Sequence, residues 1–116
     1  RRKYIKIVKI ENVEWIKIRF PFSKKDIMKI NAIPKFSYQH DKGSHEHYFQ
    51  LTEKSIDNIC SQFINTQFEI DKKLVDDFLD RLIRIEEEPI YMTGAQETER
   101  RKKIYQALLD TCEKNS

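Results

Sequence analysis

The sequence has few glycines, few prolines, few cysteines and no long apolar run. Gly43 and Gly94 are the only glycines among 116 residues, which excludes collagen-like repeats, flexible glycine linkers and glycine-rich phosphate-binding loops. No segment approaches the ~18 consecutive apolar residues of a membrane span. The two cysteines, Cys60 and Cys112, are too few for a disulfide framework or a four-thiolate zinc site. Because both fall inside helical patterns, we expect buried free thiols in a reducing compartment.

The first residues carry no apolar signal segment. The chain opens with Arg1-Arg2-Lys3 rather than with methionine, a pattern that predicts a piece of a longer intracellular protein. The length suits one globular domain or two very small ones. We therefore expect a cytoplasmic protein with no membrane partner.

Charge is distributed unevenly along the chain. The net charge of +3 combines 22 Lys+Arg with 19 Asp+Glu. Residues 1–36 hold 11 basic and 3 acidic side chains, or +8, whereas residues 37–116 hold 11 and 16, or −5. A basic front followed by an acidic back favours one surface that meets a polyanion. The alternative is that lysine-rich strands merely keep a sheet soluble.

Residues 1–64 predict a ββαββα unit whose small antiparallel sheet is covered by both helices. β-Branched and aromatic residues alternate in the strands, and capping residues begin the helices. The expected elements are strands at 4–10 and 15–20, a helix that starts at Ser23 and ends before Pro34, strands at 36–40 and 47–51, and a helix capped by Thr52. The fold class expected for the whole chain is α+β.

Residues 65–116 predict a short extended piece followed by a C-terminal helical hairpin. Asp71 is expected to cap an amphipathic helix, and Thr93 with Gln96 forms a capping box for the last helix. Two helices cannot bury both apolar stripes by themselves. The segment therefore packs on residues 1–64, packs on a second chain, or begins a further domain. The first stripe, expected to serve as core or as an interaction surface, includes Leu74, Phe78 and Leu82.

The first two strands predict a basic and aromatic sheet face. Side chains alternate across a strand, so Ile16, Ile18 and Phe20 point together into a core. The opposite face then carries Tyr4, Lys6, Trp15, Lys17 and Arg19. Lysine and arginine neutralise phosphates and a flat ring stacks on a base, so this face favours nucleic acid, with Lys24 and Lys25 nearby. The alternative is that Trp15 packs against a C-terminal helix.

Residues 13–64 resemble a known module. The run Trp15-Ile-Lys-Ile-Arg-Phe-Pro-Phe-Ser precedes a short helix, Ile33-Pro34, two aromatic strands around a turn, and a capped helix. This order is similar to the N-terminal accessory module of tyrosine-recombinase-type integrases of mobile elements and, more distantly, to the HARP domain of annealing helicases. Tyr38 and either His47 or Tyr48 stand where that pattern has tryptophans. The resemblance implies a module that contacts DNA and positions a separate catalytic domain.

The chain is not expected to be an enzyme or to hold a cofactor. A recombinase catalytic domain needs its own arginines, a histidine-containing box and a nucleophilic tyrosine, and the chain is too short to hold that domain as well. The three histidines, His40, His45 and His47, surround one predicted turn, so a zinc or other transition-metal site is one interpretation. An exposed polar hairpin tip is the other, since no cysteine pair or His-Glu-x-x-His pattern accompanies them.

Three functions stay open at this point. The first is a DNA-binding accessory domain of an integrase or site-specific recombinase, with duplex DNA as partner. The second is a protein-interaction or dimerisation module that uses the C-terminal helices, with a second copy or the parent chain's downstream domains as partner. The third is single-stranded nucleic-acid binding on the sheet.

The basic run 100–103 covers most of a helical turn and is expected to form an exposed helix surface.

Overall fold

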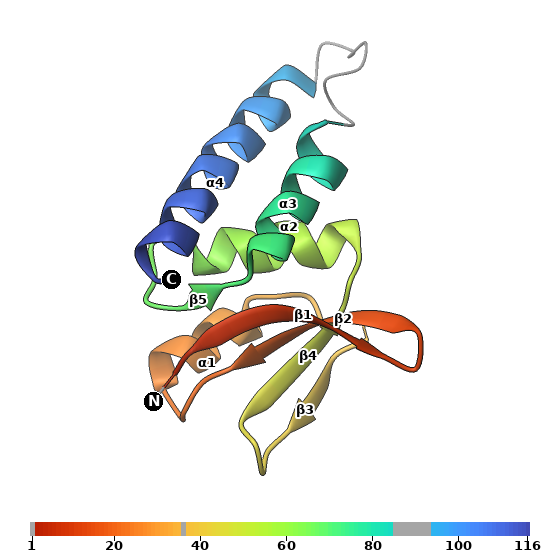
Figure 1. Ribbon diagram of the computed structural model, residues 1–116, viewed down its shortest axis with the longest axis vertical. Helices are drawn as coiled ribbons and strands as arrows, with labels where there is room; N and C mark the ends of the chain where they lie inside the picture. The colour runs from red at the N-terminus through yellow and green to blue at the C-terminus, as the bar shows by residue number, and fades with distance from the viewer. Residues whose placement is uncertain (1, 36, 85–93) are drawn as a thin grey trace.

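The computed structural model describes residues 2–35, 37–84 and 94–116. The elements, in chain order, are β1 (Tyr4–Ile10), β2 (Val13–Arg19), α1 (Lys24–Asn31), β3 (Gln39–Asp41), β4 (Glu46–Gln50), α2 (Glu53–Phe63), β5 (Glu69–Ile70), α3 (Lys72–Phe78), the π-helix η1 (Leu79–Ile83) and α4 (Gly94–Lys114). A sheet and a group of helices form separate layers (Figure 1), which confirms the predicted α+β class. The expected cap Thr93 lies outside the described residues.

The five strands form a mixed sheet in the order β3-β4-β2-β1-β5. Strands β1 to β4 pair antiparallel, as predicted. The extended piece before α3 adds β5 parallel to β1, because the chain crosses over through α2 and returns to the free edge of β1. There the Glu69 N–H donates to the Lys3 carbonyl and the Asp71 N–H to the Ile5 carbonyl, each at 2.9 Å. The prediction of a purely antiparallel sheet therefore missed one edge strand.

A two-residue turn joins β1 to β2. Glu11 and Asn12 both have positive φ, 50° and 66°, as in the type I′ turns whose twist matches that of the flanking strands. Strand β2 therefore starts at Val13, two residues earlier than predicted. Since β4 pairs with residues 15–19 and β5 with residues 4–5, the turn end of the hairpin continues as a two-stranded ribbon.

One face of the sheet packs against the helices. Ile5, Ile16 and Ile18 are buried there together with Phe49 of β4. Helix α1 adds Ile30, and α2 adds the whole of its predicted apolar stripe, Ile56, Ile59, Cys60 and Phe63. The α2 stripe faces the core because Thr52 begins the helix in a capping box with Ser55. The helices leave the other face of the sheet uncovered.

The C-terminal elements pack on the first unit. Helices α2, α3 and α4 lie on the same side of the strands (Figure 1). Leu74, Phe78 and Leu82 are buried in one core with Ile5 and Ile16. Of the two roles expected for this stripe, core or interaction surface, the structure shows the core, because the chain's own elements already cover it. Among the described residues, none of the helices has the length and apolar character that crossing a bilayer requires.

The predicted amphipathic helix after Asp71 changes geometry halfway. Asp71 caps its start by accepting a hydrogen bond from the Lys73 N–H at 3.1 Å. From Leu79 the helix widens into η1, where the Arg84 N–H donates to the Leu79 carbonyl at 3.0 Å, five residues back. Both Leu82 and Ile83 are buried on this wider turn.

Both cysteines are buried and free, as expected. The Cys112 thiol donates a hydrogen bond to the Ile70 carbonyl at 3.0 Å and so ties α4 to β5. Burial raises the pKa of the Cys60 thiol. Neither sulfur is poised as a thiolate nucleophile.

Candidate nucleic-acid interface

The open pleat of the sheet, opposite the core, gathers the side chains predicted from the first two strands. Tyr4 lies opposite Arg19 in the β1–β2 ladder, Lys6 lies opposite Lys17, and Trp15 lies one pair further along that face. Since alternate residues point to opposite faces, all five share one surface, which we call the open face. The structure thus brings together the predicted set from β1 and β2.

Strand β4 contributes three further side chains to the open face. Its register places Gln50 opposite Trp15, Tyr48 opposite Lys17 and Glu46 opposite Arg19. The sequence did not predict that these three residues join this face. The signal was the alternation of polar and buried positions along 46–50, but alternation does not say beside which strand β4 lies.

Lys17 is neutralised within the chain. Its Nζ lies 2.9 Å from Oε2 of Glu46, and the Tyr48 hydroxyl donates to Oε1 of the same carboxylate at 2.8 Å. Burial acts to raise the pKa of Glu46, but hydrogen bonds from Lys17 and Tyr48 outweigh it and hold that pKa at about 2. Burial acts to lower the pKa of Lys17, yet hydrogen bonds with Glu46 and Tyr4 raise it overall. Both groups are therefore charged at neutral pH, and each satisfies the other.

Lys6 and Arg19 are the cations that the open face offers to a phosphate. Across residues 2–35, 37–84 and 94–116, neither forms an ion pair with a carboxylate. Lys6 is exposed, and its Nζ lies 5.0 Å from the centroid of the Tyr4 ring, within cation–π range. Arg19 is partly exposed. Their charge is thus available to an incoming anion.

A partly apolar hollow of about 290 Å³, called the apolar hollow below, lies at the ribbon end of the open face. Its lining consists of Trp15, Tyr48, Gln39, Glu11 and the exposed apolar residues Ile10 and Val13. The Trp15 side chain is partly exposed, and within the described parts of the chain no helix lines the hollow. The alternative in which a C-terminal helix covers Trp15 is therefore wrong. The open face consequently has an apolar aromatic end and a cationic end.

Lys25 of α1 does not extend this surface. Lys25 lines a different hollow, together with Lys3 and Lys29. Lys3 directly precedes Tyr4, so its side chain lies on the opposite pleat from the Tyr4 ring. Lys24 is exposed at the first position of α1. The structure thus does not bring Lys25 to the open face, although it follows β2 closely in sequence.

The three histidines do not form a metal site. His47 is 2% exposed; its ring stacks between Phe20 and His40, and a hydrogen bond of 2.8 Å joins its Nδ1 to the Tyr38 hydroxyl. His45 precedes β4 with a positive φ of 59° and is exposed. In the described parts of the chain, no three His, Cys, Asp or Glu side chains are grouped to hold a metal ion. The suggested site fails because His47 points into the core.

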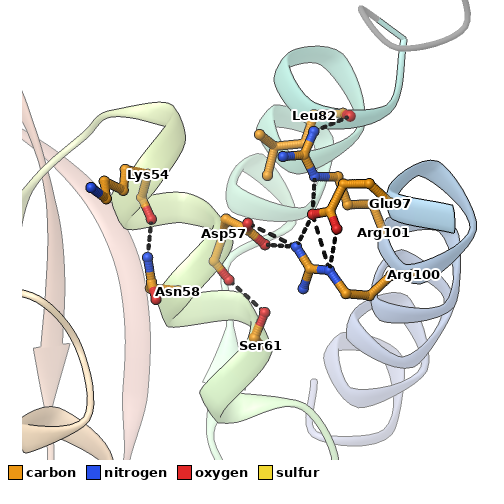
Figure 2. Close-up of polar contacts among 8 residues, drawn as sticks. All are labelled: Lys54, Asp57, Asn58, Ser61, Leu82, Glu97, Arg100 and Arg101. Carbon is orange, nitrogen blue, oxygen red and sulfur yellow. Dashed lines mark hydrogen bonds and ion pairs between the residues drawn. The ribbon is translucent and has the colours of Figure 1, made fainter. Parts of the chain in front are cut away.

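Two arginines of the basic run on α4 make contacts with neighbouring helices. Figure 2 shows Arg100 reaching from α4 to Asp57 of α2, with N–O distances of 3.0 and 3.2 Å, and also contacting Glu97. Arg101 also contacts Glu97, with nitrogen and oxygen 3.3 Å apart, and donates to the Leu82 carbonyl at 3.3 Å. The expectation that residues 100–103 form an exposed surface therefore holds for Arg100, Lys102 and Lys103 but not for Arg101, which is partly buried.

We compared the chain with protein-family models, curated protein sequences and solved structures, and none of these comparisons found a match.

Proposed function

We propose that this chain is a non-enzymatic DNA-binding accessory module of an integrase or site-specific recombinase of a mobile element, and that it holds duplex DNA on the open face. The observation that carries the proposal is the placement of Trp15 with Lys6 and Arg19 on the uncovered pleat of a sheet whose other pleat is core. The resemblance of residues 13–64 to integrase N-terminal modules supports the same function.

The mechanism combines phosphate neutralisation with contact to the bases. Lys6 and Arg19 pair with backbone phosphates, and each such contact releases condensed counterions. Trp15 and Tyr4 present flat rings to sugar or base. The two-stranded ribbon at the end of β1 and β2 has the width that the major groove of B-DNA admits. The apolar residues at its tip, Ile10 and Val13, suit contact with thymine methyl groups.

The deciding measurement is fluorescence anisotropy with labelled duplex DNA across a salt series. Each phosphate contact contributes about −0.9 to the slope of log K against log salt. The double variant Lys6→Gln with Arg19→Gln removes one cation from each of the two strands and should therefore flatten the slope by about 1.8. The matched control is Lys103→Gln with Lys114→Gln, which removes the same charge from exposed positions of α4.

Two results would contradict the proposal. One is an affinity of the unaltered chain for duplex DNA that does not change with salt concentration, so that the slope is zero. The other is an equal loss of affinity in the α4 control, because net charge rather than the open face would then explain binding. Trp15→Ala should weaken binding without changing the slope, since the ring carries no charge.

Single-stranded nucleic acid is a second candidate, favoured by the hollow beside Trp15 and Tyr48. An unstacked base can lie on an aromatic side chain, which is worth about 1–3 kcal/mol per base. Trp15 is the sole tryptophan of the sequence, so its fluorescence reports occupancy of the hollow directly. Strong quenching by single strands, together with displacement of duplex by single strands at equal concentration, would favour this candidate over duplex DNA.

A further inference from the structure

A second hollow, of about 350 Å³, lies between α1 and the loop that leads from α2 to β5. Lys25 and Lys29 of α1 line one side, and Lys3 with Asp26 lies beside them. The loop, residues 64–68, forms the other wall. This hollow shares no lining residue with the apolar hollow beside Trp15.

The charges around this hollow leave an excess of two cations. Lys3 is committed to Asp26, with Nζ and Oδ2 2.8 Å apart and the Asp26 side chain only 5% exposed. No carboxylate in the described ranges forms an ion pair with Lys25 or Lys29. A partly buried ion pair thus lies beside two lysines whose ammonium groups are available to an anion.

The loop wall is held in place by the C-terminal helix. The Asn115 side-chain amide donates to the Thr66 carbonyl at 2.8 Å and to the Phe68 carbonyl at 2.7 Å. Thr111 accepts the Asn65 N–H at 2.9 Å. A wall that is already ordered loses little conformational entropy when a ligand binds.

The hollow also has an apolar part and polar side chains. Phe68 and Ile64 line it. Asn65 and Gln67 of the loop also line it, and both are exposed. Amide groups donate hydrogen bonds to phosphate oxygens, and lysine is a common phosphate ligand. Lysines and amides beside apolar side chains suit a ligand in which an anionic group is attached to a less polar part.

We propose that this hollow binds a phosphate group, carried either by a nucleotide or by a nucleic-acid backbone. Lys25 and Lys29 neutralise its charge, and the amides of Asn65 and Gln67 donate to its oxygens. This phosphate site goes beyond the function proposed for the open face. It uses other residues, and its test does not depend on whether the open face binds DNA. If the carrier is DNA, the chain has two separate contacts for it.

The test follows backbone amide resonances by NMR during titration with inorganic pyrophosphate, with AMP and with a short DNA duplex, each at ionic strength matched with sodium chloride. We expect shifts at residues 25, 29, 65 and 67. Lys25→Gln with Lys29→Gln should weaken binding about tenfold or more, as for the loss of charge-assisted hydrogen bonds. The matched control, Lys24→Gln with Lys42→Gln, should change it less than about twofold; both lysines are exposed and neither lines the hollow.

The three probes separate the possible sources of the phosphate. Shifts with pyrophosphate or AMP but not with the duplex support a free nucleotide site. Shifts with the duplex alone support a backbone contact. The absence of shifts with all three probes would overturn the proposal, and so would an equal loss of binding in the control variant. Should the double variant lose its dispersed spectrum, Lys25→Gln alone replaces it. Trp15→Ala should leave pyrophosphate binding unchanged, because Trp15 does not line this hollow. A failure of the open face to bind DNA can therefore be distinguished from a failure of the phosphate site.

Discussion

Lys17 and Glu46 hold opposite charges 2.9 Å apart, diagonally across the β2–β4 ladder. The central lysine of the open face is therefore already paired, and Tyr48 fixes the carboxylate from its other oxygen. A basic surface that contains its own carboxylate attracts a polyanion less than its lysine content alone predicts. The pair sets how many cations the open face offers.

Removing that carboxylate should strengthen DNA binding. Glu46→Gln frees the Lys17 ammonium for a phosphate, so the salt slope should steepen by about 0.9 and affinity at low salt should rise about 3- to 10-fold. Fluorescence anisotropy across a salt series measures both. Glu113→Gln, which removes an exposed carboxylate from α4, serves as the control. Equal gains in both variants would mean that Glu46 acts only through net charge.

Buried His47 should make stability depend on pH in a mildly acidic range. Burial, with the nearby charges of His40, Lys35 and His45, lowers the pKa of His47 from 6.5 to about 4 in the folded chain. Between these values the unfolded chain binds the proton more readily, so stability is lost as pH falls below 6.5. The loss between pH 7 and pH 5 should be about 2 kcal/mol, measured by urea unfolding.

A pair of histidine variants isolates that effect. His47→Gln should be less stable at pH 7, but its stability should change little between pH 7 and pH 5. His45→Asn removes an exposed imidazole, and asparagine tolerates the positive φ at that position. It should keep the unaltered pH dependence. A steep pH dependence that persists in His47→Gln would rule out His47 as its source.

Truncation of the α3 stripe should destabilise the whole chain. Phe78 is fully buried in the core shared with the sheet, so Phe78→Ala should lower the free energy of unfolding by about 3–5 kcal/mol. Met28→Ala removes a side chain that is 68% exposed and should cost less than about 0.5 kcal/mol. A single cooperative transition that shifts in Phe78→Ala indicates one folding unit. A small effect of Phe78→Ala would mean that α3 is not part of the core.

The bridge from Arg100 to Asp57 should contribute modestly to the packing of α4 on α2. Arg100 is partly exposed and shared between two carboxylates, so Arg100→Gln should cost about 0.5–1 kcal/mol. A double-mutant cycle with Asp57→Asn should give a coupling of similar size in urea unfolding. Lys103→Gln, on the same helix and exposed, should be neutral. Zero coupling would show that the two side chains do not stabilise each other.

The sequence was sufficient where the signal is local. Alternation in β1 and β2 put Ile16 and Ile18 in the core and Trp15 on the open face, and Asp71 and Thr52 were recognisable as caps from the residues around them. It was insufficient for the site's electrostatics. Nothing local to Lys17 shows that Glu46, 29 positions later, will neutralise it. The same holds for His47, which alternation places on a face but not beneath Tyr38 and Phe20.

By itself, the sequence determined the secondary structure of the hairpin and the composition of its two faces, because pleat and helix periods depend only on neighbouring residues. The tertiary structure alone decided that β5 joins β1 in parallel, that α2 and α4 cover the α3 stripe, and that a basic hollow forms between α1 and the loop before β5. Those outcomes depend on contacts between segments tens of residues apart. Such contacts are selected by the burial of the whole apolar surface at once, and no local pattern contains that information.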